Sequence, residues 1–149
     1  MNLKDGHFIK SFKVPRFFDK ISVSYDGGSE PKELEVFELA LSLVAQLADR
    51  SSPIPHIIPP NVHFLETCSP TFTLDDDMFG CFYQAIIFPV AKWRKERLSK
   101  AKILIVMVEE LCHAVWQIPD GPPIEEKVTE VFHQIYPDFS YWEFVGEIL

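Results

Sequence analysis

The sequence predicts an α+β fold in one domain, residues 1–149, with a small mixed β-sheet packed against three main helices. Residues 21–25 alternate apolar and polar side chains, which is the period of a half-buried strand, and a Gly-Gly turn follows them. Aromatic and β-branched side chains dominate residues 79–88, which also favours a strand. Apolar side chains recur three and four positions apart, as in amphipathic helices, over residues 31–50, 91–117 and 123–136.

The first helix has clear signals at both ends. Ser29 or Glu30 can cap it, Pro31 fits its first turn, and the apolar periodicity continues to Ala48. Residues 51–60 contain four prolines, a density that neither a helix nor a central strand tolerates. We therefore expect an extended connector after this helix.

Two further strands are expected after the connector, at residues 62–68 and 69–74. The stretch 79–88 is expected to form a strand with a hairpin turn near Gln84 and an end at Pro89. Together with the early strand, these segments supply the mixed sheet.

The two later helices are delimited in different ways. Residues 91–117 are long for one helix, and we expect a break near Ser99. The apolar run 103–108 continues into polar residues without a breaker, which favours a buried helix over a strand. The last helix begins at Pro123 with acidic residues in its first turn and stops before Pro137. The aromatic tail that follows is expected to dock on the body.

Charge and composition argue against several functions. The formal net charge of −8 disfavours a nucleic-acid-binding surface, because phosphate binding needs clustered Lys and Arg. The one basic cluster, residues 92–97, is expected to be the solvated face of a helix. No segment has the length and apolarity of a secretory signal or a membrane span, and the three cysteines form no Cys-x-x-Cys pair. These features favour a cytoplasmic protein that binds neither nucleic acid nor membrane.

The stretch VEELCHAVW, residues 108–116, contains the main candidate site. It differs from the zinc-peptidase pattern His-Glu-x-x-His because Glu109 stands in place of the first histidine. Glu109 and His113 are one helical turn apart and can bind one ion together, with Glu110 beside them. A polar stripe on a buried helix needs a partner, which can be a metal, water in a cleft, or a Lys or Arg from another segment. The same residue types also occur on ordinary exposed helix faces.

The order of segments over residues 75–137 resembles the zincin-type metallopeptidases of the ImmA/IrrE-like family. In that family a strand hairpin precedes the His-Glu-x-x-His helix, and the next helix supplies a third metal ligand from a pattern that ends near a proline. Glu126, Thr129, Phe132 and His133 take the places of that pattern here, and a proline follows. The resemblance implies a zincin-like core and a hydrolase that acts on a protein or peptide.

The resemblance further implies a metal site formed by Glu109, His113 and Glu126, in which Glu110 deprotonates the water that attacks a peptide carbonyl. Glu125 is an alternative third ligand because it lies closer to the apolar face of its helix. Two glutamates and one histidine carry one more negative charge than two histidines and one glutamate, so bound zinc should be a poorer Lewis acid. Such a set can favour manganese or iron. The predicted cofactor is one divalent metal, or none if the site is degenerate.

Two other functions use the same residues. A metal-free pseudoenzyme would act as a protein-binding or regulatory module, which exposed aromatic side chains at residues 139–144 would favour over an open cleft at Glu109. Alternatively, the Glu-x-x-His pairs that begin at Glu110 and Glu130 suit a carboxylate-bridged di-iron bundle. That bundle requires a helix rather than a strand at residues 78–90.

Overall fold

The computed structural model describes residues 2–67, 71–73 and 82–145 of the chain. Its elements, in chain order, are β1 (Asn2–Leu3), β2 (His7–Phe8), a 3₁₀ helix η1 (Arg16–Phe18), β3 (Ser22–Tyr25), α1 (Leu34–Arg50), β4 (Asn61–Phe64), β5 (Phe72–Thr73), β6 (Ala85–Phe88), α2 (Val90–Lys95), α3 (Lys100–Trp116), α4 (Pro122–His133) and α5 (Tyr141–Val145). Three long helices accompany a four-stranded mixed sheet, so the predicted α+β fold is confirmed.

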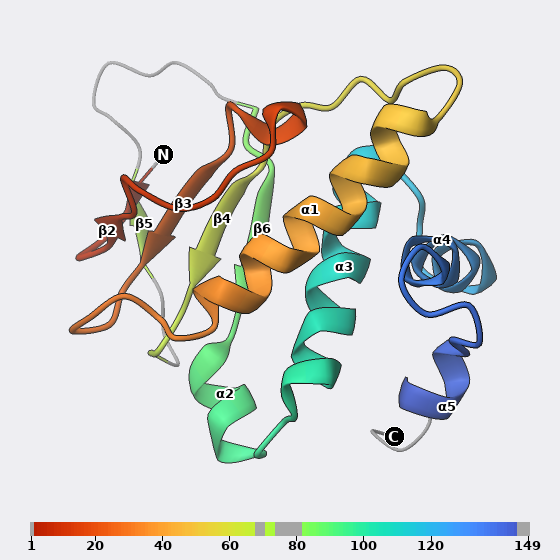
Figure 1. Cartoon of the computed structure of the whole chain (residues 1–149). Helices are drawn as coiled ribbons and strands as arrows, with labels where there is room; N and C mark the ends of the chain where they lie inside the picture. Colours follow the sequence, from red (N-terminus) through yellow and green to blue (C-terminus); the bar gives the residue numbers. More distant parts are fainter. Residues whose placement is uncertain (1, 68–70, 74–81, 146–149) are drawn as a thin grey trace.

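The four-stranded sheet has the order β2-β3-β4-β6. β3, β4 and β6 run parallel to one another, whereas β2 is antiparallel to β3. The register places Val23, Val62 and Ile86 side by side across the three parallel strands, and all three are buried. Because side chains alternate between the two faces of a strand, these residues define the core face of the sheet. The carboxyl ends of the parallel strands meet at one edge, close to the starts of α1 and α2 (Figure 1).

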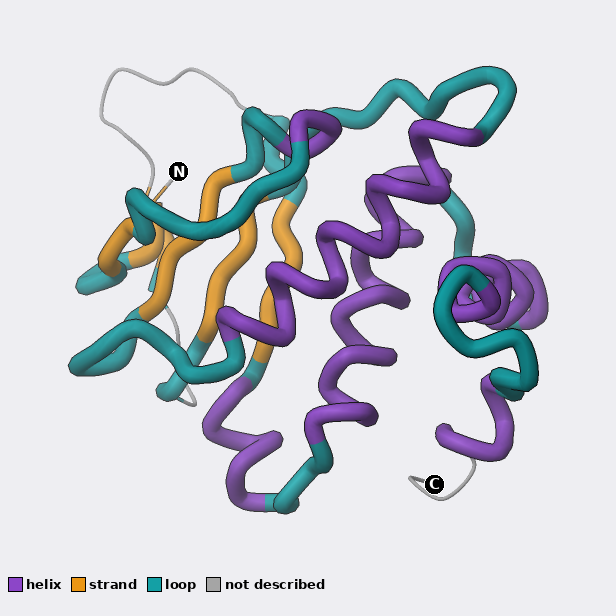
Figure 2. Tube along the Cα trace, viewed as in Figure 1, coloured by secondary structure: helices purple, strands orange, loops and turns teal. Residues whose placement is uncertain are grey.

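The helices α1 and α3 pack side by side and form the layer next to the sheet (Figures 1 and 2). Phe37 of α1 contacts Phe64 of β4 and Phe88 of β6, with a centroid distance of 5.6 Å to each ring. All three rings are at most 1% exposed, so they form the centre of the core. α4 packs on α3, and α5 packs on α4. These two helices form an outer layer beyond α1 and α3 (Figure 1).

The expected break near Ser99 is confirmed. α2 ends at Lys95, α3 begins at Lys100, and the hydroxyl of Ser99 accepts a hydrogen bond from the backbone N–H of Lys102 at 3.3 Å. Serine at this position satisfies one of the amide groups that the first helical turn leaves without a partner. The break separates a short basic helix from the long buried helix that carries the candidate site.

The predicted strand at residues 79–88 is confirmed only for 85–88, which form β6. Residues 82–84 have no regular structure, and 79–81 lie outside the described residues. The carbonyl of Gln84 accepts a hydrogen bond from the N–H of Asn61 at 2.9 Å, so the chain enters the sheet here and runs parallel to β4. The hairpin turn expected near Gln84 is therefore wrong for the described residues.

The aromatic tail docks on the body, as expected. Phe139 is buried and stacks on Phe132 of α4 with a centroid distance of 4.5 Å, and Phe144 stacks on Phe139 at 5.2 Å. This stack fixes α5 next to α4 and brings Tyr141 towards α3. Among the described helices, none combines the length and apolarity needed to cross a lipid bilayer.

Candidate functional site

The candidate site lies on the second half of α3. Buried side chains such as Met107, Val108 and Leu111 anchor this helix in the core. Glu109, Glu110 and His113 are partly buried and none of them is fully exposed, as expected for a polar stripe on such a helix. Their partners decide what the stripe can do.

Glu109 is held by the tail of the chain. The hydroxyl of Tyr141 donates a hydrogen bond to its Oε2 at a distance of 2.7 Å. Burial raises the pKa of Tyr141, and the hydrogen bond and negative charge of Glu109 raise it further. The tyrosine hydroxyl therefore keeps its proton and remains a donor to Glu109. This contact links α5 directly to the first position of the motif.

His113 is held by the loop between α3 and α4. Its Nδ1 lies 2.5 Å from the carbonyl oxygen of Ile118, and because a carbonyl only accepts, Nδ1 carries the hydrogen and donates it. Its Nε2 lies 3.3 Å from Oδ1 of Asp120, whose side chain is 98% exposed. Gln117 adopts the left-handed conformation, with φ of 54°, at the end of α3. That turn folds the chain back so that Ile118 and Asp120 reach the imidazole.

Glu110 is the most chemically unusual member of the stripe. Burial raises the pKa of this carboxyl, and the negative charges of Glu109 and Asp120 raise it further, while His113 acts in the opposite direction. Among the described residues, the carboxyl group of Glu110 has no partner in a hydrogen bond or ion pair. A carboxyl in such surroundings accepts a proton more readily than an ordinary glutamate, which is a property of general bases.

The predicted third ligand lies on α4. Glu126 is exposed and lines a groove of about 480 Å³ together with Glu125, Tyr141 and Trp142. Among the residues that the structure describes, no three His, Cys, Asp or Glu side chains are arranged to hold one metal ion. In this arrangement Glu109, His113 and Glu126 therefore do not fit as a ready-made ligand set. Whether a metal binds them stays a prediction.

Thr129 and His133, two further polar residues of α4, have local contacts. The hydroxyl of Thr129 donates to the carbonyl of Glu125 at 2.8 Å, and His133 Nε2 lies 3.1 Å from the carbonyl oxygen of Phe139. The second contact helps to fix the tail on α4. Both residues therefore have structural partners, and neither points to a second metal site.

A buried ion pair lies near the start of α3, away from the candidate site, and was not predicted from the sequence. Glu33, only 3% exposed, accepts two hydrogen bonds from Arg94, at 2.9 Å from Nε and 2.7 Å from Nη2. Arg94 also donates to Glu66 at 2.6 Å. Burial alone would raise the pKa of Glu33, but the hydrogen bonds and charge of Arg94 hold it below its usual value. The basic cluster at 92–97 is thus more than a solvated helix face.

Gly27 leaves room for the ion pair between Glu66 and Arg94. A Cβ atom at this position would collide with the carboxylate of Glu66, which Arg94 holds in place. The first glycine of the Gly-Gly turn after β3 therefore allows the chain to change direction and also leaves space for the Glu66 carboxylate.

A second buried polar group connects three segments of the sheet region. His63 of β4 is 3% exposed; its Nδ1 lies 2.5 Å from the Ser24 hydroxyl and its Nε2 lies 2.5 Å from the Tyr83 hydroxyl. Burial lowers the pKa of His63, which favours the neutral imidazole. The alternation of Val62, His63 and Phe64 predicts that the histidine faces away from the core, but not that this face is covered.

Comparisons with protein-family models, with curated proteins and with solved structures found no match to this chain.

Proposed function

We propose that the chain is a zincin-like protein whose α3 site is not catalytic and that it acts as a protein-binding or regulatory module. The hydrogen bond from Tyr141 to Glu109 carries this proposal. A metal ion that used Glu109 as a ligand would have to compete with this bond for the carboxylate. Asp120 adds a second contact of the same kind, because its Oδ1 lies 3.3 Å from Nε2 of His113. Glu109 and His113 are thus satisfied by other parts of the chain, which is one of the roles that such a stripe can have.

The outer helices offer a surface for a partner protein. Trp142 is 56% exposed, and Ile135 and Tyr136 at the end of α4 are 57% and 47% exposed. Apolar side chains of this size often mark contact surfaces when they gather in one region. Exposure of the tail aromatics would favour this function, and they divide into two groups, because Trp142 faces solvent whereas Phe139 is buried. The acidic groove beside Trp142 would favour a partner with basic side chains.

A variant metallopeptidase is the second candidate, and one observation favours it. The Nδ1–H of His113 donates to a backbone carbonyl, which is how many metal-binding histidines direct Nε2 towards the metal. Glu110, with its raised pKa, would then be the base. In this candidate Glu109, His113 and either Glu126 or Asp120 would have to move together to hold one divalent ion, because the described residues contain no preformed group of this kind.

Metal analysis of a small set of variants separates the two candidates. We expect the unchanged protein, purified without chelator, to contain far less than one equivalent of divalent metal. Glu109→His restores the usual ligand set and removes the carboxylate that Tyr141 bonds, so it should bind about one equivalent of zinc. Lys102→His adds an imidazole elsewhere on α3 and should bind no more zinc than the parent.

Third-ligand variants then locate the carboxylate. In the Glu109→His background, Glu126→Gln and Asp120→Asn should differ in zinc affinity. The substitution that removes the true ligand should lower the zinc affinity by roughly 10-fold or more. A full equivalent of metal in the parent, lost in His113→Ala, would overturn the proposed function. So would hydrolysis of an unfolded protein substrate that Glu110→Gln abolishes. Absence of zinc in both the parent and Glu109→His would reject the zincin resemblance itself.

A further inference from the structure

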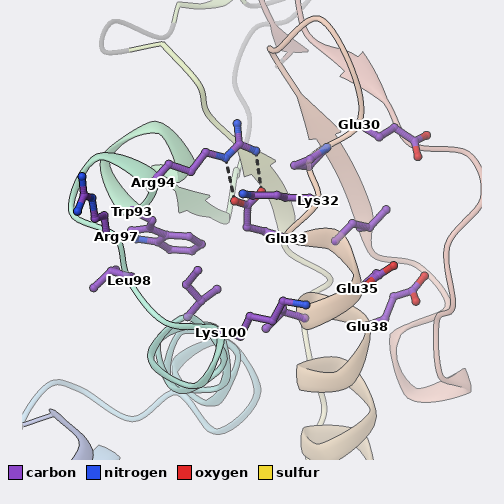
Figure 3. A pocket seen from close by; sticks show the side chains of 14 residues that line it. Glu30, Lys32, Glu33, Glu35, Glu38, Trp93, Arg94, Arg97, Leu98 and Lys100 are labelled. Carbon is purple, nitrogen blue, oxygen red and sulfur yellow. Dashed lines mark hydrogen bonds and ion pairs between the residues drawn. The ribbon is translucent and has the colours of Figure 1, made fainter.

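A cavity of about 660 Å³ lies where α1, α2 and α3 meet (Figure 3). Its size is in the range of small-molecule sites in proteins, about 300–1,000 Å³. The apolar part of its lining comes from all three segments, with Trp93 and Ile103 buried and Leu34, Val36 and Leu98 half-buried. The cavity also lies near the edge where the parallel strands end, which is where open sheets with parallel strands commonly bind ligands. None of the α3 candidate residues belongs to it.

One wall of the cavity is fixed before any ligand binds. Arg94 and the buried Glu33 line it and hold one another through two hydrogen bonds, and Glu66 anchors Arg94 from the other side. Since the positive charge of Arg94 is already shared between the carboxylates of Glu33 and Glu66, it is not available to attract an anionic ligand. These side chains give the cavity a rigid shape, which lowers the entropy lost on binding.

The other charged side chains at the rim of the cavity point in different directions. Among the described residues, Lys32, Arg97 and Lys100 form no ion pair. Figure 3 shows Lys32 and Lys100 pointing into the space between α1 and the α2–α3 segment. By contrast, Glu30, Glu35 and Glu38 point away from Trp93 in the same view.

Two further features raise the positive potential of the cavity. Both α1 and α3 have 17 residues and begin at its wall, so their amino ends contribute partial positive charge. The interior thus combines an apolar floor with two lysine side chains at the rim, of which Lys32 also interacts with the charge of Glu33.

We propose that this cavity binds a small organic acid, in which an anionic head lies near Lys32 and Lys100 and an apolar body contacts Trp93 and Leu98. Neither half of such a ligand would bind well alone, because the floor needs an apolar group and the rim needs an anion. The proposal does not depend on the function of the α3 site, which uses other residues.

Octanoate is a suitable probe, and its binding can be followed through the indole N–H signal of Trp93, assigned with Trp93→Phe. We expect saturable binding with a Kd on the order of 0.1–1 mM, whereas octanol and inorganic phosphate should bind at least about 10-fold more weakly. If octanol binds as tightly as octanoate, the rim cations contribute nothing to the affinity. If phosphate binds as tightly as octanoate, the apolar floor contributes nothing. Either result, or no saturable binding of octanoate, would overturn the proposal.

Charge-reversal variants test the rim directly. Lys100→Glu should weaken octanoate roughly threefold to tenfold, because it removes one attractive charge and adds a repulsive one. Lys95→Glu, an exposed change on α2 outside the cavity, is the matched control and should leave the affinity unchanged. If Lys100→Glu does not fold, as judged by circular dichroism, Lys32→Glu takes its place. Equal affinities for the rim and control variants would contradict the assignment of the anionic head.

Discussion

The Arg94–Glu33 pair supports a prediction in which mutation and pH act together. Glu33 has a side chain that is 4% exposed, whereas that of Arg94 is 35% exposed. Replacing Arg94 by Met keeps an apolar stem against the protein but leaves the Glu33 carboxylate buried without its counter-charge. The variant should therefore be much less stable than the parent at neutral pH, where this carboxylate would have to be buried as a charge or protonated.

The protonation route sets the size of the effect. Neutralising a glutamate with an unfolded-state pKa of about 4.3 at about pH 7 costs about 1.36 kcal/mol per pH unit, or about 3.7 kcal/mol in total. Breaking a buried pair from one side usually costs about 3–5 kcal/mol, so protonation limits the loss. We expect Arg94→Met to lower the free energy of unfolding by about 3 kcal/mol at about pH 7. At about pH 4.5 protonation is almost free, and the loss should shrink to about 1 kcal/mol.

The pH dependence of the Glu33 contribution to stability also has opposite signs in the parent and in Arg94→Met. In the parent the folded pKa of Glu33 is lowered, so its contribution to stability is present above the unfolded pKa and lost as the pH falls through the folded value. In Arg94→Met the hydrogen bonds and charge of Arg94 no longer oppose burial, and only a backbone hydrogen bond and the charge of Lys32 still do. The folded pKa should therefore rise, and the contribution is then lost as the pH increases. Urea unfolding followed by far-UV circular dichroism at several pH values measures both trends.

Two controls make this test specific. The double variant Glu33→Gln/Arg94→Met has no buried carboxylate, so its difference in stability from the parent should be constant near neutral pH and should shrink only in acid, where the parent loses the contribution of Glu33. Glu66→Gln removes only the partly exposed partner of Arg94 and should cost less than about 1 kcal/mol. If Arg94→Met loses the same free energy at neutral and acidic pH, or less than about 0.5 kcal/mol at both, the buried-pair argument is refuted.

Three further predictions concern single residues. The folded pKa of His63 is lowered by burial, so the parent should lose stability as the pH falls below about 6.5, and His63→Gln should flatten that decline in thermal unfolding between about pH 7.5 and 5.5; parallel curves would contradict it. The raised pKa of Glu110 contributes stability below its unfolded value that is lost as the pH rises, so Glu110→Gln should gain stability relative to the parent near neutral pH but not in acid, and an equal change at both would contradict it. Phe37→Ala, at a site 0% exposed, should cost about 3–5 kcal/mol in urea unfolding, while Trp142→Ala, at a site 56% exposed, should stay within about 0.5 kcal/mol; similar losses would contradict the core assignment.

The elements that were predictable are those specified by neighbouring residues. In α1 the apolar positions Phe37, Leu41, Val44 and Ala48 are all buried, because helical periodicity alone places them on one face. The end of α2 and the start of α3 followed from Ser99 for the same local reason. The pairing of β6 was not local. Its parallel alignment with β4 depends on the path of the intervening chain, which residue patterns in β6 itself do not specify.

The site residues show the same division. Glu109, Glu110 and His113 lie within one helical turn or so, and their common face was predictable from their spacing. Their partner Tyr141 lies 32 positions from Glu109, and nothing in the spacing predicts that contact. Glu33 is 61 positions from Arg94, and only the assembled sheet and helices bring them together.

The helix α3 connects the two sites that the chain offers. Lys100 at its start faces the cavity, whereas Glu109 lies nine residues later, about 14 Å along the helix axis at about 1.5 Å per residue. Residues separated by more than about 10 Å without shared partners usually act independently. Lys100→Glu should therefore alter octanoate affinity without changing zinc binding to Glu109→His, and octanoate should not change that zinc affinity either. A measurable coupling would mean that α3 moves as a unit between the cavity and the Tyr141 contact, because no side chain is shared between them.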